Sequence, residues 1–166
     1  MNISVTNSLS LRLFYNHNAT IAHGSSRKSQ STGTLSMADA SALRNAIRRL
    51  QEYDFEDATE AQIQEKLKAF TDTMNNALSS ASKYGKGDTS VKNAAATIKR
   101  LNNEYASTME KIGITIDKDG TMSLYDNAAK NYSAKKFNDF FTKDSKYLND
   151  VYDAARKISR KVDVRI

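Results

Sequence analysis

Two long apolar stripes, separated by a short connection, limit most strongly what this chain can fold into. From Ile63 to Tyr84 the apolar residues recur at alternating spacings of four and three, and from Val91 to Ile112 they keep the same heptad spacing. Such a narrow stripe is typical of an α-helix that packs against an antiparallel partner. The glycine-containing connection, residues 85–88, has the length that joins neighbouring antiparallel helices. The sequence therefore predicts a long αα-hairpin.

The composition agrees with a helical protein. Among its 166 residues the chain has no proline and only 6 glycines. Long helices can therefore continue without a break. Cysteine is also absent, which excludes disulfides and thiolate zinc sites. The length suits one domain with its own core, and no apolar run is long enough to span a membrane.

Further helices are predicted on both sides of the hairpin. Thr59 and Gln62 form a capping-box pattern at the start of the first hairpin helix, and Ser36 with Asp39 resembles a second capping box. We expect helices over residues 36–50 and 146–162, because apolar residues recur there at helical spacing. The predicted fold is mainly α: one domain, residues 36–166, forming an antiparallel helical bundle built on the αα-hairpin.

The first 35 residues differ from the rest. They are rich in Ser, Asn and Thr, contain no Asp or Glu, and hold both histidines, His17 and His23. Their apolar residues fall at odd positions, an alternation that would also fit a strand: Ile3, Val5, Leu9, Leu11 and Leu13. We interpret residues 1–35 as a flexible N-terminal tail. Without acidic neighbours, the two histidines are not predicted to bind a metal or to act in catalysis.

The segment from Ile112 to Leu124 breaks the helical pattern. Ile114 and Ile116 alternate with a polar residue, and the same alternation follows in residues 122–124. Between these two runs lies Asp-Lys-Asp-Gly, a sequence typical of turns, since aspartate bonds its own backbone and glycine accepts positive φ. The sequence predicts a short β-hairpin at about residues 113–124.

The same segment allows a calcium-binding alternative. If Gly120 is placed at the sixth position of an EF-hand loop, then Asp117, Asp119 and Asp126 fall at positions 3, 5 and 12. Thr115 then occupies the first position, where the EF-hand uses aspartate. We interpret the segment as a plain turn. A calcium- or ligand-binding regulatory protein is the alternative function.

The sequence contains no motif that indicates catalysis or nucleic-acid binding. Cysteine nucleophiles, a Gly-x-Ser-x-Gly elbow and a phosphate-binding glycine loop are all absent from the sequence. The formal net charge is +6, but the basic residues of the last forty positions are mixed with aspartates, as on a solvated helix face. We therefore predict a non-enzymatic protein without a cofactor and without a nucleic-acid partner.

A resemblance to a known family is carried by Lys111 to Leu124, KIGITIDKDGTMSL. This segment resembles the signature GI-T-x-D-x-DGT-L-S-L of bacterial flagellar filament cap proteins, the hook-associated protein 2 family. The likeness extends over about residues 60–142, with a long helical hairpin before the signature and an aromatic segment, residues 135–141, after it.

The resemblance implies a structural module similar to the helical stem of that family, without its outer domains. Such a module would assemble with flagellar or surface proteins, or with itself, through helical seams. The resemblance further implies a bacterial protein exported by a flagellar-type route without a cleaved signal peptide. A cytoplasmic location is the alternative.

A partner site is predicted at the far end of the αα-hairpin. The helices expected at 36–50 and 146–162 are too short to cover both arms fully. Uncovered apolar residues mark a site for another helix. The partner-binding residues predicted on this basis are Leu78, Ala81, Tyr84 and Val91.

Overall fold

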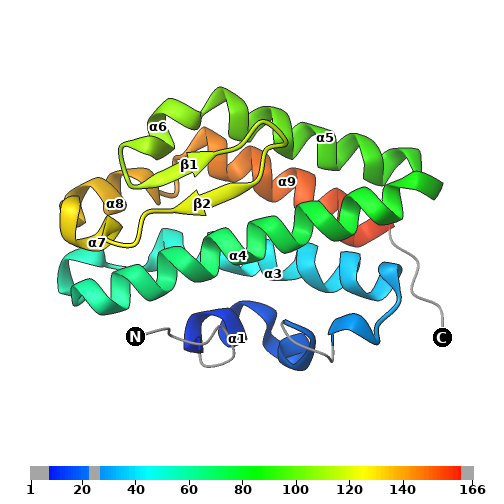
Figure 1. Cartoon of the computed structure of the whole chain (residues 1–166), viewed down its shortest axis with the longest axis horizontal. Helices are drawn as coiled ribbons and strands as arrows, with labels where there is room; N and C mark the ends of the chain where they lie inside the picture. Colours follow the sequence, from blue (N-terminus) through cyan, green and yellow to red (C-terminus); the bar gives the residue numbers. More distant parts are fainter. Residues whose placement is uncertain (1–7, 23–26, 162–166) are drawn as a thin grey trace.

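The computed structural model describes residues 8–22 and 27–161. Four long helices form an up-down-up-down bundle, in which each helix runs antiparallel to its neighbours (Figure 1). They are α3 (Thr32–Glu52), α4 (Glu60–Tyr84), α5 (Thr89–Glu104) and α9 (Lys146–Lys161). Helix α9 packs against both α5 and α3 and so closes the ring. The predicted mainly-α bundle is confirmed.

The connections of the bundle differ greatly in length. Short 3-10 turns join α3 to α4 (η3, Phe55–Asp57) and α4 to α5 (η4, Gly85–Gly87). The connection from α5 to α9 holds five elements: α6 (Ala106–Glu110), β1 (Ile114–Ile116), β2 (Met122–Leu124), α7 (Ala128–Asn131) and α8 (Ala134–Phe140). The two strands pair as the predicted antiparallel hairpin, which lies beside α4 and α5 (Figure 1).

Side-chain caps fix where α4 and α5 begin. Thr59 accepts from the Gln62 backbone while the Gln62 side chain accepts from the Thr59 backbone, which confirms the predicted capping box. Asp88 caps α5 by accepting from the backbone of Val91 at 3.0 Å. The second arm is shorter than its heptads suggest, because Tyr105 leaves the helical region (φ −101°, ψ 13°) before α6 begins.

The N-terminal segment is helical and packed, so the expectation of a flexible tail is wrong for its described part. Helix α1 (Leu9–Tyr15) and the 3-10 helix η2 (Asn16–Ile21) lie along α3 and α4 (Figure 1). Leu11, Phe14 and Tyr15 are buried. Their burial supplies the apolar free energy that a free tail would lack. Residues 1–7 and 23–26, including His23, lie outside the described residues.

Helix α3 begins earlier than predicted. Ser31, not Ser36, is the N-cap, and its hydroxyl accepts from the backbone of Thr34. Ser36 and Asp39 lie inside the helix, where both are buried. The result is a helix of 21 residues that runs along α4 for most of its length.

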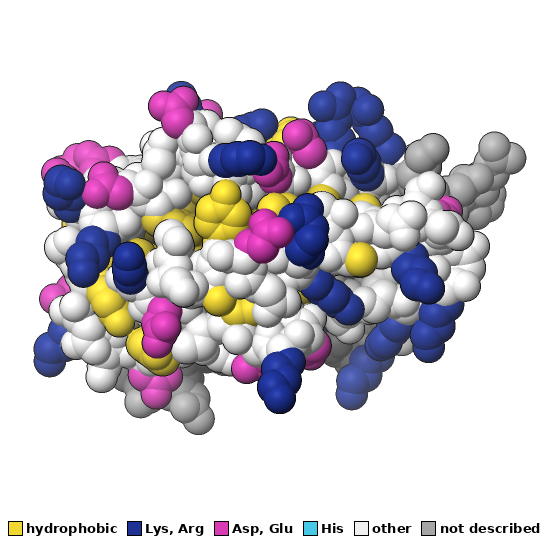
Figure 2. Space-filling model, turned by 90° about the horizontal axis from the view of Figure 1, so that it is seen from above, with side chains coloured by type: hydrophobic (Ala, Val, Ile, Leu, Met, Phe, Trp, Pro, Cys, Tyr) yellow, Lys and Arg dark blue, Asp and Glu magenta, His cyan; other side chains and the backbone are white. Residues whose placement is uncertain are grey.

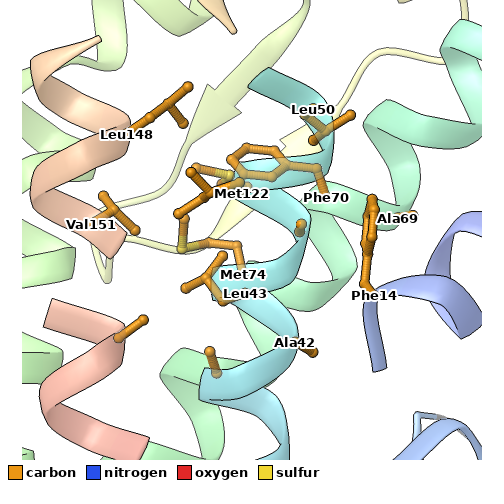
Figure 3. Packing of buried hydrophobic residues seen from close by; sticks show 14 of the residues in the cluster. Phe14, Ala42, Leu43, Leu50, Ala69, Phe70, Met74, Met122, Leu148 and Val151 are labelled. Carbon is orange, nitrogen blue, oxygen red and sulfur yellow. The ribbon is translucent and has the colours of Figure 1, made fainter. Parts of the chain in front are cut away.

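The core lies along the axis of the bundle, and every long helix contributes to it. Figure 3 shows Leu43 and Leu50 of α3, Phe70 and Met74 of α4, Met122 of β2, and Leu148 and Val151 of α9 packed together. At one end Phe141 stacks on Phe55 with ring centroids 5.4 Å apart and meets Phe70 edge-on. Among the described residues no helix has the combination of length and apolar character that crossing a membrane requires.

Candidate functional site

The β-hairpin formed by β1 and β2 is a local structure distinct from the helices around it. Ile114 pairs with Leu124 and Ile116 with Met122, and the turn closes with a hydrogen bond from the Asp117 N–H to the Thr121 carbonyl. Ile114 and Met122 are buried against the helices. The hairpin therefore turns one apolar face inward, as strand alternation requires.

Three amide side chains from α4 and α5 hold the backbone of the hairpin region. Asn75 of α4 donates to the carbonyl of Met122 at 2.8 Å and accepts from its N–H at 2.7 Å. The side chain of Asn75 thus makes the two hydrogen bonds that a third strand would make to this residue of β2. Because both ends of the amide are used, the pairing fixes the orientation of β2 as well as its distance from α4.

Asn102 of α5 joins the tip of the hairpin to α9. Its amide donates to the carbonyl of Gly120 at 2.9 Å, and its oxygen accepts a hydrogen bond from the Tyr147 hydroxyl. The side chains of Asn102 and Tyr147 are buried, at 0% and 1% exposure. A buried amide with both ends satisfied is strongly position-specific, since any shift leaves a polar group unpaired.

Gln64 of α4 anchors the chain just beyond β2. Its amide donates to the carbonyl of Tyr125 at 2.9 Å, and its oxygen accepts from the N–H of Ala129 at the start of α7. Together, Gln64, Asn75 and Asn102 form what we call the amide clamp. The clamp binds backbone groups at residues 120, 122, 125 and 129 to the two arms of the αα-hairpin.

Two glycines allow the hairpin to approach the helices closely. Gly113 has φ +87°, and a Cβ placed there would lie 2.6 Å from the Cβ of Ala128. Gly120 has φ +86°, and its Cβ would lie 2.9 Å from the Cβ of Lys99 on α5. Both the backbone conformation and the lack of space therefore demand glycine at these positions.

The calcium alternative is not supported by the positions of its proposed ligands. Asp119 accepts from the N–H and the hydroxyl of Thr121, and these hydrogen bonds lower the pKa of Asp119. In the part of the chain that the structure describes, no three Asp, Glu, His or Cys side chains gather as a metal site, and Asp117, Asp119 and Asp126 are exposed. The carboxylates of Asp117 and Asp119 stabilise the turn by accepting hydrogen bonds from Thr121.

The predicted partner site at the far end of the αα-hairpin is also corrected. Leu78, Ala81 and Val91 are at most 2% exposed, and Tyr84 is half-buried against the core. The prediction was wrong because α3 begins at Thr32 and covers the arm that a helix starting at residue 36 would have left bare. These four side chains stabilise the bundle from within.

A second polar centre joins the N-terminal segment to the bundle. The carboxylate of Asp39 is 0% exposed and accepts from Tyr15, Ser80 and both terminal nitrogens of Arg27, at 2.6 to 2.7 Å. Burial and the neighbouring Asp39 raise the pKa of Tyr15 well above its usual value. Because the carboxylate oxygens are satisfied internally, this centre is suited to holding α1 and η2 in place.

The sequence contains one signal for the amide clamp. Asparagine is a poor residue for a helix interior, yet Asn75 and Asn102 lie deep inside predicted helices, next to core positions. A polar side chain that is buried against a core needs a hydrogen-bond partner. The partners, however, are 47 and 18 residues away in sequence, and nothing local identifies them.

Comparisons with protein-family models, with curated proteins and with solved structures find no match for this chain. The class of protein is therefore defined by its own architecture. The chain is a four-helix bundle whose last connection carries a clamped β-hairpin.

Proposed function

We propose that this chain is a non-enzymatic structural module that assembles with other protein chains. We further propose that it is similar to the helical stem of flagellar filament cap proteins. The observation that carries the proposal is the amide clamp. Where the chain resembles the family signature, its residues serve to fix a hairpin to a helical bundle.

The individual signature residues support this interpretation. Gly113 and Gly120 permit the close approach, Ile114 and Met122 fill the core, and Asp119 closes the turn. None of these roles calls for a substrate. The hairpin and the segment that follows it are held at four backbone positions and brace α4 against α5, and a braced bundle suits a module that bears load between other chains.

Under this proposal the chain is a bacterial protein that reaches the flagellum through the flagellar export route, as an accessory of the axial proteins. The experiment uses a flagellated bacterium that carries the chain, with the chromosomal copy epitope-tagged. Flagella are sheared, purified with their hooks and caps, and probed for the tag. We expect the tagged chain in the flagellar fraction.

The matched variants test whether the clamp matters for assembly. Asn102→Ala removes the buried amide, whereas Asn103→Ala removes an exposed amide that bonds only to Lys99 of its own helix. We expect Asn102→Ala to be depleted from flagella and Asn103→Ala to behave as wild type. A wild-type chain that is folded and abundant in the cell but absent from purified flagella would contradict the proposed function.

A further inference from the structure

The described residues leave the groove between α5 and α9 uncovered. The groove between α3 and α4 is covered by α1 along part of its length, and the hairpin lies over α4 and α5. Between α3 and α9 the guanidinium groups of Arg44 and Arg48 lie over the ring of Tyr152, at 5.2 and 3.9 Å from its centre. The remaining groove, between α5 and α9, is open to solvent, has a volume of about 560 Å³ and is lined, among the described residues, by those two helices.

The floor and the walls of this open groove differ in character. Small or apolar side chains, Ala94, Leu101 and Ala154, form the floor, and each is 4% exposed. The wall on α9 carries Asp150, which pairs with Lys146, together with Asp153 and Lys157, and the wall on α5 carries Arg100. On the side of the molecule where α5 lies, charged side chains of both signs are interspersed (Figure 2).

The hydrogen bond between Tyr147 and Asn102 sets the relative level of the two helices. Helices α5 and α9 run antiparallel (Figure 1). Counted from the Asn102–Tyr147 hydrogen bond at about 1.5 Å per residue, Arg100 and Asp153 are about one turn apart along the groove. Helical side chains lean toward the N-terminus of their own helix. Arg100 and Asp153 therefore lean toward the same level from opposite walls.

This arrangement is self-complementary. A two-fold axis parallel to the helices would place α5 of one chain over α9 of a second chain at the same level. Each Arg100 would then face Asp153 of the other copy, twice per dimer. Asp153 is exposed and has no hydrogen-bond or ion-pair partner among the described residues, and Arg100 holds only the exposed Glu104 of its own helix.

We propose that the α5–α9 groove is the interface of a homodimer, in which Arg100 of each copy pairs with Asp153 of the other. This inference rests on the proposed function as an assembling module and names its partner, a second copy of the chain. The walls are polar, so the dimer is weak and forms at high protein concentration. The competing possibility is that an acidic or basic helix of a different protein binds in the α5–α9 groove.

The test is trans-complementation by charge reversal, read by light scattering and analytical ultracentrifugation over a range of concentrations. Arg100→Glu and Asp153→Lys each place like charges at both symmetry-related contacts, so each should raise the dimer Kd at least about tenfold. A mixture of the two variants should form a heterodimer near wild-type strength. At one of its contacts the two substituted side chains, of opposite charge, face each other, and at the other contact Arg100 faces Asp153 as in the wild type.

The control is Lys68→Glu on α4. Lys68 forms the same kind of exposed i,i+4 ion pair with Asp72 that Arg100 forms with Glu104, but it lies outside the groove. We expect Lys68→Glu to dimerise as wild type. A wild type that stays monomeric, a control that weakens dimerisation equally, or single variants that fail to pair on mixing would each overturn the homodimer. A monomer that still enters flagella would leave the proposed function standing.

Discussion

Tyr147 of α9 donates a hydrogen bond to the side-chain oxygen of Asn102 of α5. The side-chain nitrogen of Asn102 in turn donates to the carbonyl of Gly120 at the tip of the hairpin. Two helices and the hairpin thus meet at one buried amide. The relationship explains how a segment with only two three-residue strands stays ordered, since an isolated hairpin of that size is marginal in water.

We predict that Asn102→Ala lowers the free energy of unfolding by about 2–4 kcal/mol, because it leaves the Tyr147 hydroxyl and the Gly120 carbonyl buried without a partner. Tyr147→Phe should cost about 1–2 kcal/mol for the same reason. The two effects should not add in the double variant, since both break one network. Urea denaturation measures all three. Asn103→Ala is the exposed control, and equal losses for Asn102→Ala and Asn103→Ala would refute the prediction.

A glycine pair tests the close approach of the hairpin. Gly113→Ala should destabilise the fold by about 1–3 kcal/mol, because the backbone has positive φ and the new methyl group would meet Ala128. Gly87→Ala should be neutral or slightly stabilising, since a Cβ added there would meet no atom within 4 Å and its φ is not in the left-handed region. Thermal and urea unfolding of both variants provide the comparison. Equal changes in the free energy of unfolding for the two variants would argue against the close contact between Gly113 and Ala128.

The packed N-terminal segment predicts a contrast between adjacent residues of α1. Phe14 is 3% exposed, so Phe14→Ala should cost about 3–5 kcal/mol. Leu13 is 40% exposed, so Leu13→Ala should change stability by less than about 0.5 kcal/mol. An unfolding midpoint of Phe14→Ala equal to that of the wild type would show that α1 is not packed against the bundle.

The buried tyrosines predict a loss of stability in alkali. Burial raises the pKa of Tyr147, and burial together with Asp39 raises the pKa of Tyr15. In the unfolded chain both phenols ionise at about pH 10. The folded state therefore holds more protons than the unfolded state above that pH. The contribution is fully present below about pH 10 and is lost as the pH rises further.

A spectrophotometric titration of the eight tyrosines, combined with circular dichroism, checks this behaviour. Two phenols should ionise only as the helix signal is lost, and Tyr147→Phe should remove one of them. Reversible titration of all eight at about pH 10 with the helix intact would show that neither phenol is buried.

The sequence was sufficient for the parts of the fold that local patterns encode. The heptad stripes predicted α4 and the α4–α5 reversal, the Thr59–Gln62 capping box is formed, and alternation around Asp-Lys-Asp-Gly located the hairpin. Each of these features depends on residues a few positions apart, where backbone propensity and side-chain spacing act together.

The features that were missed depend on distant partners. Helix α1 is held by Glu65, which accepts from Ser8 and Ser10 more than fifty residues earlier, and by Asp39. In so short a segment, Leu11 and Phe14 fit a helix while the odd-numbered residues fit a strand, and only tertiary contacts decide between them. The amide clamp was missed for the same reason, and the partner site was misplaced because the start of α3 was misjudged.

Side-chain amides clamp the β-hairpin to the bundle, and amide hydrogen exchange at Met122 tests this arrangement most directly. The N–H of Met122 donates to the side chain of Asn75, so its protection depends on the clamp. We predict that Met122 exchanges as slowly as the core amides of α4, and that Asn75→Ala accelerates its exchange while the centre of α4 keeps its protection. Exchange of Met122 in wild type as fast as that of the exposed turn residue Lys118 would contradict the account.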